Sequence, residues 1–166
     1  MLQLTLIRHA KSDWGDRSVA DFDRPLNDSG LSSAPVMGRA LLKHAVKFDQ
    51  LFASPALRAI TTAKLIATEI GYNTDNIHTV DELYNASLAT LVDFIRDLDV
   101  NAQHIAIVAH NPGMSELCEY FCSESVGDLP TCAVMIIEFD LDTWEVVSRH
   151  SGHPALYDYP RNHKRK

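Results

Sequence analysis

The stretch Leu2-Gln3-Leu4-Thr5-Leu6-Ile7-Arg8-His9-Ala10 decides the fold of this chain. Its apolar residues form a nearly continuous run of the length of a strand, and the run ends in the basic pair Arg8 and His9. A second run, residues 105–109, is wholly apolar and ends at His110. Continuous apolar runs are typical of strands that helices cover on both faces, as in parallel sheets. The two runs therefore predict an α/β domain.

Strand-like and helix-like segments alternate along the rest of the chain, and its 166 residues suit one domain. We predict a single-domain, three-layer α/β/α sandwich with a central, mostly parallel sheet. Pro35 interrupts the first helical pattern, which indicates a kink or a late helix start. Helix N-caps are expected at Asn27, Ser54 and Asn111, the last two each followed by a proline at the first helical position. Further strands are expected at 48–53, 77–80, 133–139 and 145–149, the last two as a hairpin across 140–143.

The net charge of −7 is unevenly distributed. The segment 161–166 holds four basic groups, so the first 160 residues carry 11 basic and 22 acidic groups, a net charge of −11. An acidic body disfavours nucleic acid as a partner. No apolar stretch approaches the roughly 20 residues of a membrane span, so we expect a cytoplasmic protein with no membrane partner. We expect a domain over 1–160 and a frayed, solvated basic tail over 161–166.

Basic residues occur at several positions where a predicted strand is followed by a helix. Arg8 and His9 end the first strand, Arg58 lies in the first turn of the helix after the second, and His110 follows the strand 105–109. Ligands of open α/β sheets bind at the carboxyl ends of the strands, and helix N-termini there attract anions. Guanidinium groups match phosphate oxygens in bidentate geometry. The pattern predicts a site for a phosphate group.

Several motifs resemble the histidine phosphatase superfamily, which includes the phosphoglycerate-mutase-like enzymes. Leu6-Ile7-Arg8-His9-Ala10 resembles its "RHG/RHA" signature. The full set is similar to the short, SixA-type phosphohistidine phosphatase branch. The remaining matching stretches are Arg24-Pro25-Leu26 with Gly30, Ser54-Pro55-Ala56-Leu57-Arg58-Ala59 with Thr62-Ala63, Leu83-Tyr84, and Val108-Ala109-His110-Asn111-Pro112-Gly113.

The resemblance implies a role for each matching residue. His9 would be the nucleophile that takes up the phosphoryl group, while Arg8, Arg58 and His110 would hold the phosphate oxygens. Arginines can supply the charge that phosphoryl transfer needs, and no Asp or His cluster suggests a metal site. Three cysteines without a CxxC pair predict neither a disulfide framework nor a zinc site. We therefore expect no cofactor and no metal.

The proton donor for the leaving group is poorly defined in the sequence. Glu82 and Asp13 are both candidates for this general acid. Only the short segment 71–76 separates the second helix from the next strand, which leaves no room for a covering insertion. An open pocket with a weak acid favours a labile phosphate on a large partner. The preferred substrate is therefore a protein carrying phosphohistidine.

Two alternatives remain open at this point. One is a small-molecule phosphomonoesterase or mutase of the same superfamily, acting on a small phosphorylated substrate. The other is a non-catalytic, phosphate-binding regulatory module.

Overall fold

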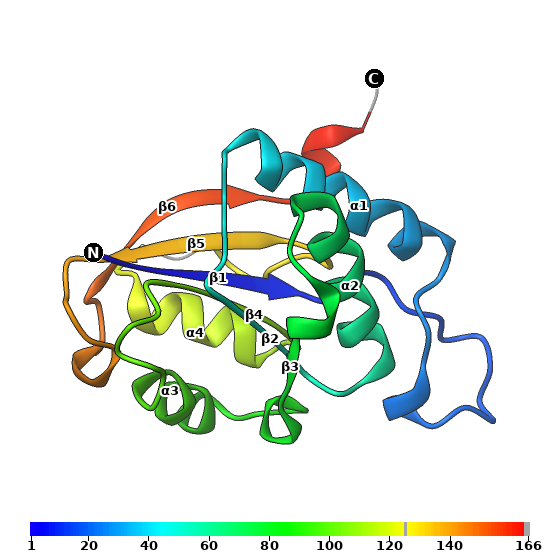
Figure 1. Cartoon of the computed structure of the whole chain (residues 1–166). Coiled ribbons are helices and arrows are strands. Elements are labelled where there is room, and N and C mark those ends of the chain that lie inside the picture. Colours follow the sequence, from blue (N-terminus) through cyan, green and yellow to red (C-terminus); the bar gives the residue numbers. More distant parts are fainter. Residues whose placement is uncertain (125, 165–166) are drawn as a thin grey trace.

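The computed structural model describes residues 1–124 and 126–164 and has a central six-stranded sheet (Figure 1). The strand order is β3-β2-β4-β1-β5-β6. The expected α/β class and the mostly parallel sheet are confirmed. The strands are β1 (Leu2–Arg8), β2 (Gln50–Ala53), β3 (His78–Thr79), β4 (His104–Ala109), β5 (Val134–Phe139) and β6 (Gly152–Asp158). The α-helices are α1 (Asp28–Lys43), α2 (Leu57–Ile70), α3 (Leu88–Arg96) and α4 (Gly113–Phe121).

Strand β1 lies in the middle of the sheet and sets its register. It pairs in parallel with β4, where Leu6 lies opposite Ile107, and in antiparallel fashion with β5. Strand β2 also runs parallel to β4. The carboxyl ends of β1, β2 and β4 therefore meet at one edge of the sheet, which is where the motifs of the sequence end.

Helices cover both faces of the sheet (Figure 1). Alternate residues of β1 point to opposite faces, as strand geometry requires. Ile7 belongs to the core under α1 and α2, whereas Leu4 and Leu6 belong to the core under α3 and α4. Both cores are closed to solvent, so the sheet is a rigid platform for the loops at its edge.

The second late strand lies further along the chain than predicted. The segment 145–149 is not a strand; it overlaps a short 3₁₀ helix, η4 (Trp144–Val146), and the strand is β6 instead. Trp144 is fully buried, and its indole N–H donates to the carbonyl of Ala102 at 2.7 Å, which holds this segment away from the sheet. Most β6 side chains are exposed or half-buried, so the strand lacks the apolar pattern that would reveal it.

One of the three expected N-caps is confirmed. The Asn27 side chain accepts a hydrogen bond from the amide of Gly30 at 2.9 Å, and α1 continues from there through Pro35 without a late start. The predictions that Ser54 and Asn111 are the N-cap residues are wrong, because α2 begins after Ala56 and α4 after Pro112. The Ser54 hydroxyl lies 2.7 Å from Nε2 of His110. The Asn111 side chain still accepts a hydrogen bond from the amide of Ser115, in the first turn of α4, at 3.1 Å.

The chain after β6 is more ordered than expected. Residues Pro160–His163 form a 3₁₀ helix, η5, so the prediction of a frayed tail is wrong for 161–163. Residues 165 and 166 of that tail lie outside the described residues. In the described part of the chain, no helix has the length and apolar character needed to cross a membrane.

Candidate active site

His9 follows the last residue of β1 and is buried. Its Nδ1 lies 2.7 Å from the carbonyl oxygen of Ala10, which can only accept a hydrogen bond. Nδ1 must therefore carry the proton, which leaves a lone pair on Nε2. Burial lowers the pKa of His9 to about 4, with further lowering by the positive charges of Arg58 and Arg8. The His9 imidazole is thus neutral at pH 7, with a free lone pair on Nε2.

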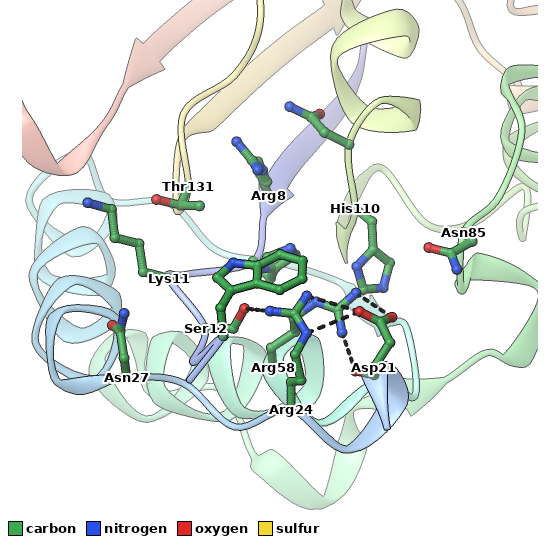
Figure 2. A pocket seen from close by; sticks show the side chains of 13 residues that line it. Arg8, Lys11, Ser12, Asp21, Arg24, Asn27, Arg58, Asn85, His110 and Thr131 are labelled. Carbon is green, nitrogen blue, oxygen red and sulfur yellow. Dashed lines mark hydrogen bonds and ion pairs between the residues drawn. The ribbon is translucent and has the colours of Figure 1, made fainter. Parts of the chain in front are cut away.

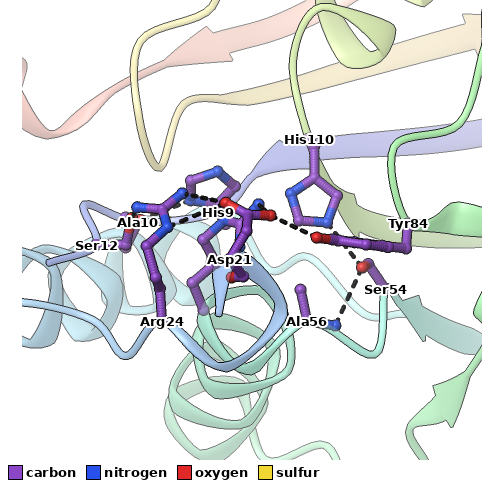
Figure 3. A network of polar contacts seen from close by, with 10 residues as sticks. His9, Ala10, Ser12, Asp21, Arg24, Ser54, Ala56, Tyr84 and His110 are labelled. Atoms are coloured by element: carbon purple, nitrogen blue, oxygen red, sulfur yellow. Dashed lines mark hydrogen bonds and ion pairs between the residues drawn. The ribbon is translucent and has the colours of Figure 1, made fainter. Parts of the chain in front are cut away.

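His110 follows β4 and lies beside His9, with 5.2 Å between the ring centroids. Its Nε2 is 2.7 Å from the hydroxyl of Ser54, which also accepts from the amide of Ala56 at 3.3 Å (Figure 3). Burial lowers the pKa of His110 to about 3, and the charge of Arg58 adds to this effect. Ser54, expected to cap a helix, instead orients this second imidazole.

Arg8 and Arg58 approach the two imidazoles from different elements. The Nη1 group of Arg8 donates to the carbonyl of Leu129 at 2.8 Å. The Nη1 group of Arg58 donates to the carbonyl of Asp21 at 2.8 Å, and its Nη2 donates to the Asp21 carboxylate at 3.2 Å. Both guanidinium groups are thereby fixed in position before any ligand binds.

Three buried nitrogen atoms of these side chains have no hydrogen-bond partner among the described residues. They are Nε of Arg8, Nε of Arg58 and Nδ1 of His110. Buried polar atoms in folded proteins are normally paired, and an unpaired one calls for an explanation. All three belong to residues that line the pocket and that the resemblance assigns to phosphate.

Asp21 also lies in this site, although the sequence did not single it out. It begins the 3₁₀ helix η1 (Asp21–Asp23), and its carboxylate accepts a hydrogen bond from the Tyr84 hydroxyl. It also pairs with Arg24 at 3.0 Å and with Arg58 at 3.2 Å (Figures 2 and 3). The Tyr84 hydrogen bond, helped by the two arginines, lowers the pKa of Asp21 to about 2. Asp21 is therefore ionised at neutral pH.

These residues line a pocket of about 620 Å³ (Figure 2). Trp14 lies at its rim with 77% of its surface exposed, and the Arg24 guanidinium stacks 3.5 Å from the centre of the indole ring. Lys11 and Asn85 at the rim are exposed as well. The floor of the pocket is thus buried and basic, while its mouth is open to solvent.

A family model provides the decisive comparison. The model of the histidine phosphatase superfamily (branch 1) matches residues 4–91, which is more than half of the chain. This chain belongs to the histidine phosphatase superfamily. The match includes His9, Arg8 and Arg58, whereas His110 lies beyond it and is placed beside them by the fold.

Two relatives of this superfamily member differ in how much of the chain they match. An uncharacterized chloroplastic protein of Arabidopsis thaliana is 26% identical over 160 residues, covering 90% of this chain and 72% of that protein. A 2,3-bisphosphoglycerate-dependent phosphoglycerate mutase of Bradyrhizobium sp. (strain BTAi1) is 39% identical over 70 residues, covering 41% of this chain and 34% of the mutase. The similarity to the mutase is limited to a segment of 70 residues.

Solved structures share the fold over nearly the whole chain. The protein histidine phosphatase SixA complexed with tungstate superimposes with a TM-score of 0.84 at 20% identity, covering 98% of this chain and all of that chain. A mycobacterial glucosyl-3-phosphoglycerate phosphatase superimposes with a TM-score of 0.69 at 13% identity, covering 96% and 98% of the two chains. The phosphoglycerate-mutase-like architecture is therefore confirmed.

Neither expected general acid of this histidine phosphatase lies in the pocket. Glu82 is exposed and lines a separate cavity beside Phe94. The Asp13 carboxylate accepts from the amide of Gly15 at 2.8 Å and does not line the pocket. Asp21 is the one carboxylate among the described lining residues. Nothing in the spacing of the polar stretch 11–24 distinguishes Asp21 from the other aspartates of that stretch.

Among the described residues, no group of three or more His, Cys, Asp or Glu side chains could hold a metal ion. The three cysteines are free and buried.

Proposed function

We propose that this protein is a phosphatase that hydrolyses protein phosphohistidine through a phosphorylated His9. The observation that carries the proposal is a neutral imidazole, with its lone pair on Nε2, beside two arginines and His110. A positioned nucleophile that forms a covalent intermediate divides one difficult displacement into two easier ones. Phosphoryl transfer otherwise needs mainly positioning and charge stabilisation.

The first step forms a bond between Nε2 of His9 and phosphorus. The bond between phosphorus and the substrate nitrogen breaks, and its electron pair leaves with the substrate imidazole, which takes a proton from solvent. Arg8, Arg58 and His110 hold the phosphoryl oxygens during the transfer. Water then attacks the phosphorus, releases inorganic phosphate and returns the electron pair to His9.

The charge state of Asp21 supports phosphohistidine as the substrate. An alkoxide leaving from a phosphate ester needs a proton from a nearby acid. The pKa of Asp21 lies near 2, so this carboxyl group holds almost no proton at pH 7. An imidazole leaves from a labile P–N bond with a proton from solvent, so phosphohistidine does not need this acid.

The exposed rim supports a phosphate presented by a protein. Trp14, Lys11 and Asn85 surround the mouth of the pocket and are open to solvent. A histidine on the surface of a folded protein could reach the floor without any part of this chain moving aside. A pocket that binds a small metabolite normally encloses that metabolite more completely.

The test compares substrates in one buffer. The purified protein is given a phosphorylated histidine-carrier protein, 3-phosphoglycerate and a sugar phosphate, each with and without EDTA. We expect kcat/KM to be highest for the phosphohistidine protein and unchanged by EDTA. A small ester preferred by tenfold or more would overturn the substrate class and favour the small-molecule phosphatase.

The nucleophile is tested by His9→Ala. We expect a loss of several orders of magnitude in turnover and loss of the acid-labile phosphoenzyme in rapid acid quench. His44→Ala, at an exposed histidine that ends α1, is the matched control and should retain both. Substantial turnover by a folded His9→Ala protein would contradict the assignment, and phosphate binding without any phosphoenzyme in the unmodified protein would indicate a binding module.

A further inference from the structure

A second cavity adjoins the catalytic pocket. Its volume is about 560 Å³, and Lys11 and Thr131 line both cavities. Beyond these two residues it extends over the first turns of α1, at Ser29 and Ser33, and onto the C-terminal segment, at Arg161 and Lys164. The two cavities are therefore neighbours: one contains His9 and the other reaches Arg161 and Lys164.

The first described residues of the tail, up to His163, are held in place by one buried carboxylate. Asp158, the last residue of β6, accepts hydrogen bonds from the amide of Tyr159 at 2.9 Å and from the Asn162 side chain at 3.0 Å. Its second oxygen lies 2.7 Å from Nε2 of His163. These contacts fold residues Pro160–His163 into η5, beside α1 (Figure 1). Arg161 and Lys164 thus line the wall of the second cavity while they remain exposed to solvent.

The charge of the second cavity is opposite to that of the molecule. Lys11, Arg161 and Lys164 bring three positive groups from two distant parts of the chain, and among the described lining residues there is no carboxylate. The first 160 residues carry a net charge of −11. Complementary charge fixes the register of a partner and rejects partners of the wrong sign.

We propose that this basic cavity binds an acidic segment of the phosphoprotein whose phosphohistidine enters the catalytic pocket. The inference rests on the proposed function and adds a sequence preference to it. Aspartate or glutamate side chains next to the phosphohistidine would meet Lys11 first and then Arg161 and Lys164. The hydroxyl groups of Ser29 and Ser33 can donate to the same carboxylates. A phosphate group without a polypeptide would occupy only the catalytic pocket.

The experiment uses two phosphohistidine peptides and phosphoramidate. The peptides differ only in three residues beside the phosphohistidine, which are acidic in one and the corresponding amides in the other. We expect the unmodified protein to hydrolyse the acidic peptide with a KM at least fivefold lower. Arg161→Gln combined with Lys164→Gln should remove this preference and leave kcat/KM for phosphoramidate within twofold.

A matched double variant controls for net charge. Lys43→Gln combined with Lys47→Gln removes the same charge from two exposed positions at the other end of α1. This control should keep the preference for the acidic peptide. Equal KM values for both peptides in the unmodified protein, or a preference that survives in the Arg161/Lys164 variant, would overturn the inference and leave the proposed function standing.

A binding measurement tests recognition of the acidic segment separately from hydrolysis of phosphohistidine. The unphosphorylated acidic peptide should bind the His9→Ala protein in calorimetry, and the binding should weaken at least fivefold when Arg161 and Lys164 are also replaced. Absence of binding would overturn the inference. Failure of the unmodified protein to hydrolyse either phosphopeptide, despite peptide binding, would overturn the proposed function instead.

Discussion

Asp21 binds side chains from three separate parts of the chain, namely Arg24, Arg58 and Tyr84. Its carboxylate pairs with Arg58, the arginine that we propose holds phosphate, and it is ionised at neutral pH. A carboxylate that is ionised at neutral pH is a poor general acid. We therefore expect Asp21 to orient the Arg58 guanidinium, which it contacts at 3.2 Å.

Asp21→Asn tests whether this residue positions Arg58 or donates a proton. The substitution keeps the shape of the side chain and removes its charge, so we expect kcat/KM to fall about tenfold, a cost of about 1.4 kcal/mol. The fall should be equal for a phosphohistidine protein and a phosphate ester, measured in the same steady-state assay. Asp23→Asn, in the same turn but outside the pocket, should change neither value. A much larger loss with the ester would assign the proton to Asp21.

Helix α1 approaches the loop after β1 more closely than any side chain would allow. A Cβ atom at Gly30 would lie 2.2 Å from the carbonyl oxygen of Lys11, which also accepts from the amide of Asn27 at 3.0 Å. The residue two positions before Lys11 is His9. The start of α1 therefore packs against the backbone that follows His9.

Gly30→Ala should disturb both stability and catalysis. The methyl group meets backbone, which cannot rotate away, and overpacking of this kind costs about 1–3 kcal/mol. The higher helix propensity of alanine offsets roughly 1 kcal/mol of that cost. We expect a lower free energy of unfolding in urea and a lower kcat/KM. Ser32→Ala, at an exposed position of the same helix, should change neither the free energy of unfolding nor kcat/KM. A Gly30→Ala protein with unchanged stability and activity would show that the loop moves to accommodate the methyl group.

A strand or a helix could be predicted from the sequence where a single local feature determines it. The apolar runs of β1 and β4 are strands because both of their faces are buried, and their ends fixed the places of His9 and His110. The helix starts were missed where a side chain serves the site, as Ser54 does for His110. Asp21 was not predicted as a site residue because tertiary folding brings it to Arg58, and its position in the sequence gives no sign of this contact.

At the scale of the whole molecule, three buried histidines control the response to acid. Burial lowers the pKa of His9 and His104 to about 4 and that of His110 to about 3. In the unfolded chain the pKa of histidine is about 6.5. Between pH 6.5 and 4 the unfolded state thus binds more protons, so stability is lost as the pH falls. Asp21, with its pKa near 2, affects stability only below about pH 4.

We expect the free energy of unfolding in urea to fall as the pH is lowered from 6.5 to 4.5. Each of the three histidines contributes a slope of up to about 1.4 kcal/mol per pH unit. His104 lies at the far end of the sheet, 2.7 Å from the hydroxyl of Thr5, and takes no part in the site. His104→Gln should reduce the slope without changing the phosphoenzyme. A free energy of unfolding that stays constant over this range would contradict the burial of the neutral imidazoles.

The two edge strands of the sheet affect the tendency of the protein to aggregate at high concentration. At one side β3 consists of only two residues, and at the other β6 contains Pro154, which lacks an N–H, at a bulge opposite Ile136 and Ile137. An exposed strand with a long row of free amides recruits strands from other molecules, and short, bulged or proline-containing borders prevent this. Neither border therefore offers a template on which further copies could add, so the sheet resists growth into aggregates.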